Sequence, residues 1–207
     1  MAEESKWRVL ANEEKIQKTI EALSRNGINA LVVDGGEEAK SKVLEIIPEN
    51  ASVMAMTSMT LEELGVSKEI NESGKYDSVR KRLSEMDKEK DGKEMLALGA
   101  APDCAVGSVH AVTEEGQVVI ASNTGSQLPA YVYSAGKVIW VVGTQKIVKN
   151  LDEAFKRIYE HSLPLESERA KKAYGVSGSN ASKLLIINEE IQASRITLIF
   201  VKENLGF

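Results

Sequence analysis

The apolar positions in the first quarter of the chain switch between helical and extended spacing. Isoleucine and leucine recur every three or four residues between positions 12 and 27, which predicts an amphipathic helix capped by the Asn12 side chain. An apolar run at 28–34 predicts a buried strand, residues 37–47 a second helix, and residues 52–57 a second strand. This alternation is typical of a parallel α/β sheet with right-handed crossover connections.

A strongly charged stretch follows. Thr60 and Glu63 have the spacing of a capping box, which predicts a short helix that ends at Gly65. Residues 75–98 begin with apolar side chains at intervals of three and four, which predicts an amphipathic helix. The charge run at 87–94 is typical of a solvated face rather than of a binding patch.

The second half of the chain is richer in strand patterns. Residues 104–112 and 117–122 predict two strands joined by the tight turn TEEG, in which Gly116 adopts a positive φ. The fully apolar run at 137–143 predicts a central strand of a parallel sheet. Two further helices are expected at 128–136 and 150–163, the second capped by Asn150, and two β-rich runs at 182–190 and 195–207.

Together these elements predict a single α/β domain over residues 1–207, with a Rossmann-like, mostly parallel sheet and flanking helices. A chain of this length buries about 70% of its unfolded surface, which is enough for a core without disulfides. No repeat or Pro/Gly-rich linker divides it. An exposed edge of the C-terminal strands would allow pairing with a second copy, so a homo-oligomer is one expected assembly.

Composition and charge argue against two classes of protein, those that bind nucleic acids and those anchored in membranes. A net charge of −5 with dispersed basic residues argues against a nucleic-acid surface. The sequence contains neither a run of about 20 apolar residues nor a signal-peptide pattern, so we expect a cytoplasmic protein without a membrane anchor.

The sequence also contains few potential metal ligands and no glycine-rich motif of a nucleotide-binding site. Two histidines argue against a zinc site, and the single cysteine, Cys104, cannot hold an iron–sulfur cluster alone and is expected to be an inert core thiol. No metal site is therefore predicted. The glycines match neither the dinucleotide fingerprint nor the P-loop, so the cofactor is left unknown.

Four polar loops follow predicted strands. Ligands of open parallel sheets bind beyond the carboxyl ends of the strands, where backbone N–H groups gather. These loops are 57–60, 107–110, 122–127 and 143–146. We expect them to bind a small anionic or organic-acid ligand.

Each loop also has a simpler interpretation. The hydroxyls of the first loop would suit a carboxylate or phosphate, or would only cap the helix that follows. The loop SNTGSQ at 122–127 could present donors and acceptors to a ligand, or could bond its own backbone. The lysine of the last loop could hold an anion or begin a solvated turn. The ligand-binding candidates are Ser58, Thr60, Ser108, Asn123, Thr124, Gly125, Ser126, Gln127 and Lys146.

Two residues are candidates for proton transfer. His110 follows an apolar strand near a candidate loop and could act as a general acid or base, although such a histidine is more often structural. Glu114 could serve as a second proton carrier, or could simply belong to the hairpin turn. These are the catalytic candidates.

The order of motifs resembles the lactate-utilisation (LUD) domain family. The motifs are VMAMTSMTLEELG, AVGSVHAVTEEGQVVIAS, SNTGSQ, GKVIWVVGTQKIVKNLDEAFKRI and the terminal VKENLGF. The resemblance covers most of the chain and implies a fold like that of sugar-phosphate isomerases and CoA transferases. It also implies a role in the oxidation of lactate or a related small hydroxy acid, with iron–sulfur clusters carried by partner subunits.

Two classes of function follow. The first is an accessory or substrate-handling component of hydroxy-acid oxidation that works with an iron–sulfur redox partner. The alternative is a stand-alone enzyme of the isomerase or acyl-transferase type, which would bind a phosphate- or CoA-like anion and use His110 or Glu114 to move a proton. Whether the chain is itself an enzyme is left open by its sequence.

Overall fold

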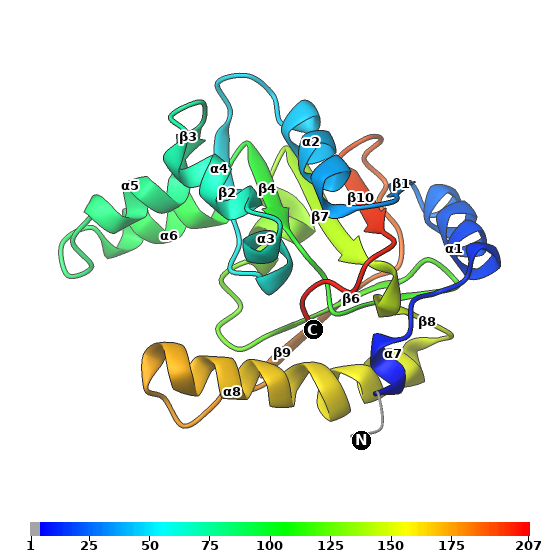
Figure 1. The fold of residues 1–207 in the computed structure, drawn as a ribbon. Helices are drawn as coiled ribbons and strands as arrows, with labels where there is room; N and C mark the ends of the chain where they lie inside the picture. Colours follow the sequence, from blue (N-terminus) through cyan, green and yellow to red (C-terminus); the bar gives the residue numbers. More distant parts are fainter. Residues whose placement is uncertain (1–4) are drawn as a thin grey trace.

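The computed structural model describes residues 5–207 and has a six-stranded sheet at its centre (Figure 1). The strand order is β1-β10-β7-β4-β2-β3, and all neighbours run parallel. The predicted parallel α/β sheet is therefore confirmed. Its strands are β1 (Asn29–Val33), β2 (Ser52–Ala55), β3 (Asp77–Ser78), β4 (Cys104–Gly107), β7 (Lys137–Gly143) and β10 (Ile196–Val201).

One face of this sheet is covered by helices. The apolar side chains of α2, α3 and α4 pack there against those of β2, β4, β7 and β10. These helices are α2 (Gly36–Ile46), α3 (Met59–Glu63) and α4 (Val66–Glu72). The first helix, α1 (Glu13–Arg25), packs on the opposite face, and its predicted cap is confirmed because Asn12 Oδ1 accepts the Lys15 N–H at 2.9 Å.

The opposite face is also covered by a second sheet, which the sequence pattern does not predict. Its order is β8-β5-β6-β9. The strands are β5 (Ala111–Thr113), β6 (Val118–Ser122), β8 (Ile147–Val148) and β9 (Lys183–Ile187). The predicted hairpin between β5 and β6 is confirmed, with Gly116 at φ +81°. Helices therefore flank the central sheet fully on one face only.

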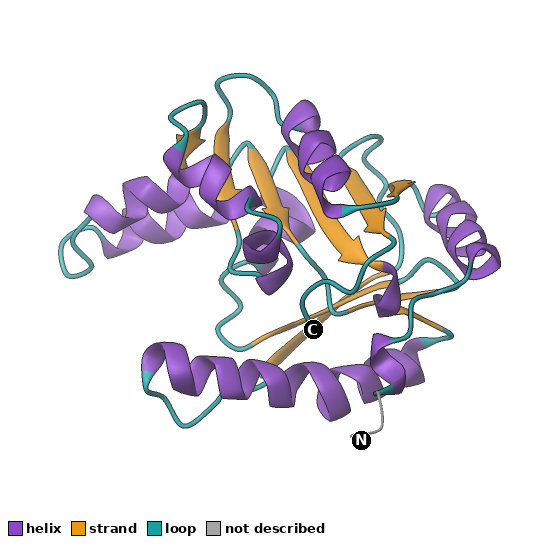
Figure 2. Cartoon of the chain, in the orientation of Figure 1, coloured by secondary structure: helices purple, strands orange, loops and turns teal. Residues whose placement is uncertain are grey.

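A long helix forms the outermost layer beneath the second sheet (Figure 2). It consists of α7 (Leu151–Arg157), a π-helical turn η4 (Ile158–Ser162) and α8 (Leu163–Tyr174). It runs well beyond the predicted end at residue 163. Asn150 caps its start, as expected, by accepting the Glu153 N–H at 3.1 Å.

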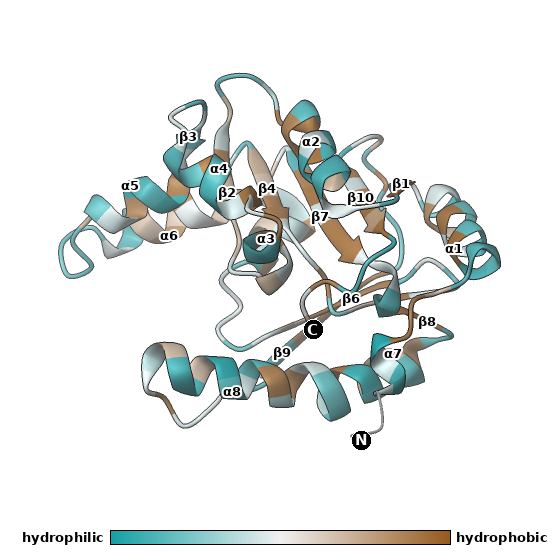
Figure 3. Cartoon of the chain, in the orientation of Figure 1, coloured by the Kyte–Doolittle hydropathy of each residue, from teal (hydrophilic) through white to brown (hydrophobic). Residues whose placement is uncertain are grey.

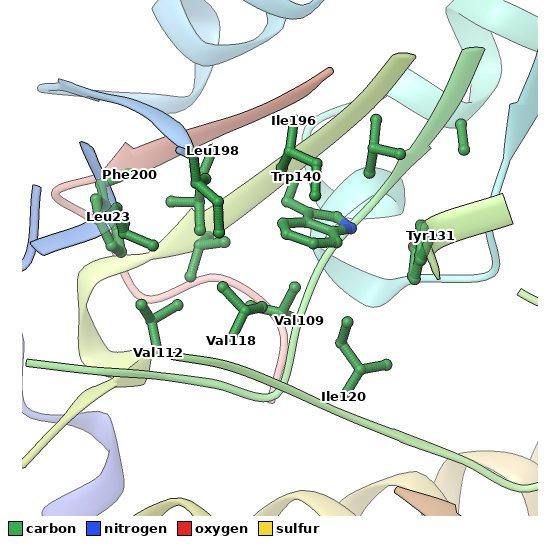
Figure 4. Close-up of a cluster of buried hydrophobic side chains, with 14 of the residues drawn as sticks. Leu23, Val109, Val112, Val118, Ile120, Tyr131, Trp140, Ile196, Leu198 and Phe200 are labelled. Carbon is green, nitrogen blue, oxygen red and sulfur yellow. The ribbon is translucent and has the colours of Figure 1, made fainter. Parts of the chain in front are cut away.

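The central strands are buried on both faces, so their side chains alternate between two cores. Val138, Trp140 and Val142 of β7 point toward the second sheet, whereas Ile139 and Val141 point toward α2 and α3. Figure 4 shows Trp140 beside the side chains of the second sheet, and Figure 3 shows the continuous apolar colouring of the central strands. Apolar burial on both faces explains why these strands read as unbroken hydrophobic runs.

The single strand expected at 104–112 is wrong. The chain leaves the central sheet after Gly107 and enters the second sheet at Ala111, so β4 and β5 belong to different sheets. At the point where the chain leaves the central sheet, Tyr131 Oη approaches Gly107 so closely that a Cβ atom there would overlap it. The apolar pattern runs through both strands because both are buried.

The amphipathic helix expected to begin within residues 75–98 is confirmed, but it ends early and a second helix follows. This segment contains β3, α5 (Val79–Glu85) and α6 (Gly92–Ala100), and the two helices project together at one side of the molecule (Figure 1). The Asp91 carboxylate accepts the Asp87 N–H at 2.9 Å, which closes the turn between the helices. Three short one-turn segments complete the fold, at η1 (Lys6–Arg8), η2 (Ala130–Ser134) and η3 (Thr144–Lys146).

Of the two C-terminal strands expected to offer an exposed edge, only β9 lies at the edge of a sheet. β10 lies between β1 and β7, and the edge position in the second sheet belongs to β9. The expected homo-oligomer stays a prediction, but β10 cannot provide its contact by edge pairing.

Within residues 5–207, no helix combines the length and the apolar character needed to cross a membrane.

Gly107→Ala tests the close approach of Tyr131 at the end of β4. We expect a loss of about 1–3 kcal/mol in the free energy of unfolding, because the added methyl group overpacks against Tyr131. Chemical denaturation measures it. Gly92→Ala, where nothing lies within 4 Å of the added atom, is the matched control. A Gly107→Ala change as mild as the control would contradict this account.

Candidate functional site

The central sheet has a topological switch point between β2 and β4. From β2 the chain passes outward to β3, and from β4 it passes the other way to β7 and β10. Ligands of open α/β sheets bind outside the carboxyl ends of the strands at such a point. The loops that follow β2 and β4 are 57–60 and 107–110, two of the four that the sequence predicts.

A cavity of about 540 Å³ lies at this point. All four predicted loops line it, together with parts of η4, α8 and the C-terminal segment. The second sheet brings the 122–127 loop to the same place from below, after β6. Of the predicted residues, those that line the cavity are Ser58, Thr60, Ser108, His110, Asn123, Thr124, Ser126, Gln127 and Lys146.

The 122–127 loop bonds partly to itself and partly faces the cavity, so it has features of both interpretations. The Ser122 hydroxyl accepts the Gly125 N–H at 2.8 Å and donates to Gln127 Oε1 at 2.9 Å, so part of the loop satisfies itself. Gly125 has φ +88° and shapes the turn without lining the cavity. Asn123 and Thr124 line the cavity, with Asn123 Oδ1 accepting the Ser182 hydroxyl at 3.1 Å.

Three side chains from three separate loops meet on the wall of the cavity. Lys146 Nζ lies 3.3 Å from Thr60 Oγ1 and 3.2 Å from Ser108 Oγ, and the two hydroxyls lie 3.4 Å apart. Thr60 also donates to the Leu205 carbonyl at 3.4 Å. We call Thr60, Ser108 and Lys146 the hydroxyl–lysine cluster.

The predicted capping box is replaced by this arrangement. The N-cap of α3 is Ser58, whose side chain makes no capping bond, and Thr60 turns into the cluster instead. The Glu63 carboxylate accepts the Gly206 N–H at 2.8 Å rather than a helix N–H. These contacts hold the C-terminal segment against α3, beside the cavity.

Lys146 is a buried cation without a counter-ion. Its exposed fraction is 3%, and none of the ion pairs in the described part of the chain includes it. Burial, followed by the nearby Arg157 charge, lowers the pKa of Lys146 to about 7, although Glu63 acts in the opposite direction. The amine is therefore poised between its two protonation states at neutral pH.

Arg157 is the main residue that the sequence interpretation missed. It is fully buried, and its Nη1 donates to the His110 carbonyl at 2.6 Å and to the Ser162 hydroxyl at 3.0 Å. Its Nε and Nη2 have no hydrogen-bond partner among residues 5–207. Helical spacing offered a signal, because Arg157 lies three residues after Ala154 and one before Ile158, on the apolar face of α7.

Other charged side chains line the cavity. Arg80 donates from Nη2 to the Ala55 carbonyl at 2.8 Å and to Thr57 Oγ1 at 3.1 Å, which fixes it beside the first loop. Arg169 forms a bidentate pair with Glu166, with both bonds at 2.7 Å, and that hydrogen-bonded carboxylate raises the pKa of Arg169. Arg80 is thus the cavity-lining guanidinium without a carboxylate partner among the described residues.

The two catalytic candidates have different surroundings. His110 Nδ1 accepts the Ala121 N–H at 3.1 Å, so the neutral ring carries its proton on Nε2. Burial, with the Lys146 and Arg157 charges, lowers the pKa of His110 to about 3, which keeps the ring neutral. Glu114 lies outside the cavity and pairs with Lys18 at 2.7 Å and Lys15 at 3.8 Å. The structure therefore brings His110 to the site but not Glu114.

The surroundings of Cys104 do not favour a reactive thiol. It is fully buried in β4, and burial raises the pKa of its thiol to about 12. The expectation of an inert core thiol agrees with this environment.

Comparisons with known proteins identify a family and a fold. The family model described as the LUD domain matches residues 16–201. The chain is similar to the solved structure of a DUF162 family protein from Deinococcus radiodurans, with a TM-score of 0.57 and 12% sequence identity, over 93% of this chain and 99% of that chain. At that identity the likeness concerns the fold alone. A comparison with curated proteins finds no match.

Lys146→Met tests whether the buried lysine lowers the stability of the folded chain. The folded pKa of about 7 lies below the ordinary 10.5, so between these values the unfolded chain binds more protons than the folded chain. Stability of the wild type therefore rises with pH through that window. At pH 7 we expect the variant to be more stable by about 1–3 kcal/mol. The reason is that a neutral methionine replaces a buried amine that has no charged partner.

Thermal unfolding from about pH 6 to about pH 10 measures the effect, and the advantage of the variant should shrink as the pH rises. Lys149→Met, at an exposed lysine three residues further along, is the matched control. A Lys146→Met variant that is less stable than the wild type at neutral pH would show that Lys146 is a structural contact.

Proposed function

Because the chain belongs to the LUD domain family, as its motifs suggest, we propose that it binds a small organic-acid anion in the four-loop cavity. In this proposal the chain is a substrate-handling component in the oxidation of lactate or a related small hydroxy acid. The family name supports the reaction class, and the chemistry of the cavity supports the charge and size of the ligand.

The observation that carries the proposal is the pair of buried cations without carboxylate partners. Lys146 contacts two hydroxyls, and Arg157 contacts a carbonyl and a hydroxyl, so neither charge is neutralised within the described chain. A buried charge is costly unless it is paired. Lys146 lines the cavity, so a carboxylate there would supply its missing pairing.

The remaining lining suits a hydroxy acid. Thr60 and Ser108 offer hydroxyls beside Lys146, and the neutral His110 can donate from Nε2. These groups could bond the hydroxyl of a 2-hydroxy acid while the cation holds its carboxylate. A cavity of about 540 Å³ falls in the range of small-molecule sites.

The proposal assigns electron transfer to a partner. The LUD resemblance implies subunits that carry iron–sulfur clusters, and the one cysteine of this sequence is insufficient for such a cluster. This chain would then bind and present the acid, and its partner would accept the electrons.

Calorimetry with lactate and its methyl ester tests the ligand. The ester has the same hydroxyl and carbon skeleton but one added methyl group and no carboxylate charge, so we expect it to bind about tenfold more weakly or worse. Lys146→Met should reduce lactate binding to the level of the ester, and Lys149→Met should leave it unchanged. Equal binding of acid and ester would contradict an anion site.

The affinity for lactate should fall as pH rises above about 7. An anion raises the pKa of Lys146 above its free value of about 7, so binding takes up a proton in this window. Calorimetry from about pH 6 to about pH 9 in buffers of different ionisation enthalpy measures this uptake. An affinity independent of pH would remove Lys146 from the anion site.

Oxidation assays test the accessory role separately. With an artificial electron acceptor, the chain alone should not turn lactate over, and turnover should appear when an iron–sulfur partner subunit is added. Lactate oxidation by the purified chain alone would favour the stand-alone enzyme instead.

A further inference from the structure

The hydroxyl–lysine cluster contains the parts of a nucleophilic site. Ser108 Oγ lies 3.2 Å from Lys146 Nζ, within the range expected for a nucleophile and its base before substrate binds. Ser108 is the more exposed member and lines the cavity, whereas Lys146 is 3% and Thr60 1% exposed. The hydroxyl thus faces the cavity with the amine behind it.

The hydrogen bonds around the cluster define a direction for proton transfer. Thr60 donates to the Leu205 carbonyl at 3.4 Å, which leaves its oxygen free to accept from Lys146 at 3.3 Å. A neutral amine that donates to Thr60 directs its lone pair elsewhere, and Ser108 is its other neighbour. Thr60 therefore orients the base, as the third group of a catalytic triad does.

The backbone makes room for this arrangement. Gly206 has φ +60°, and a Cβ atom there would lie 2.6 Å from Thr60 Oγ1 and 3.4 Å from Lys146 Nζ. The C-terminal segment can thus approach the cluster closely and exclude water from the amine. Exclusion of water and the Arg157 charge favour the unprotonated form of a lysine.

We propose that Ser108 is a nucleophile for acyl transfer, with Lys146 as its general base and Thr60 as a positioning residue. The substrate class is an ester or thioester of a small carboxylic acid. This inference goes beyond the proposed function and does not depend on it.

The reaction is balanced by the groups in the cavity and by water. Ser108 Oγ bonds to the acyl carbon and passes its proton to Lys146 Nζ. The bond to the alcohol or thiol breaks, and the leaving group takes the proton from Nζ. Water then attacks the acyl-serine by the same route in reverse order, which releases the carboxylic acid and restores Ser108.

Labelling of the purified full chain with a fluorophosphonate probe tests the nucleophile, followed by intact mass measurement and peptide mapping. We expect one label, on Ser108, and none in Ser108→Ala. Lys146→Met should slow labelling about 100-fold or more, which is typical of a lost general base. Ser41→Ala, at an exposed serine on α2, should label like the wild type. A label elsewhere, or equal rates in Lys146→Met, would overturn the proposal.

The pH profile separates a base from a structural lysine. The charged groups near Lys146 are Arg157 and Glu63, and the nearby His110 and His161 are neutral because burial lowers their pKa values. Labelling should rise with pH through about 7 and then level off, because the neutral amine is the base. Thr60→Val should slow labelling and shift this profile, and Thr60→Ser should restore both. A flat profile would overturn the role of Lys146.

The two proposals fail differently. Anion binding weakens as pH rises, whereas labelling strengthens. Hydrolysis of p-nitrophenyl acetate that depends on Ser108, without any lactate binding, would support the nucleophile and refute the anion site. Lactate binding without Ser108 labelling would do the reverse.

Discussion

The burial of two cations without carboxylate partners constrains the arrangement around the cavity. Lys146 lines the cavity and Arg157 lies outside its lining, and each is solvated only by neutral oxygens of neighbouring segments. Those oxygens come from α3, η4 and the β4–β5 loop, which are far apart in the chain. A hydroxyl or carbonyl stabilises a buried charge only at hydrogen-bond distance, so these elements must meet closely for the charges to remain inside.

The layered fold satisfies this constraint with two sheets rather than one. The central sheet brings three of the loops to its carboxyl edge, and the second sheet delivers the 122–127 loop to the same cavity. The long helix beneath the second sheet contributes Arg157 at the end of α7. The site therefore lies between layers, and it depends on their packing as much as on any single motif.

Much of this organisation was predictable from the sequence. Asn12 and Asn150 cap helices as expected, Gly116 turns the hairpin, and the unbroken apolar run of β7 identifies a central parallel strand. The gathering of three of the four loops followed from the geometry of parallel sheets, whereas the 122–127 loop reaches the cavity from the second sheet. Most predicted ligand-binding residues consequently line one cavity, although their binding role is still a prediction.

Other features have weaker signals. The run through β4 and β5 is apolar throughout because both strands are buried, so periodicity does not reveal that Gly107 ends one sheet. The sequence left open whether Lys146 holds an anion or begins a solvated turn, because the segment that packs against it, at Gly206, is far away in the chain. Arg157 was detectable from its place on the apolar face of α7, but a buried arginine contradicts the usual preference of that residue.

The packing of Trp140 has a spectroscopic consequence. Its indole is fully buried and meets the Tyr131 ring edge-on, with centroids 5.4 Å apart, while Tyr131 itself lines the cavity (Figure 4). One aromatic ring thus separates the fluorophore from the candidate ligand. The chain has only one other tryptophan, Trp7. The fluorescence emission of Trp140 should therefore change when a ligand enters the cavity.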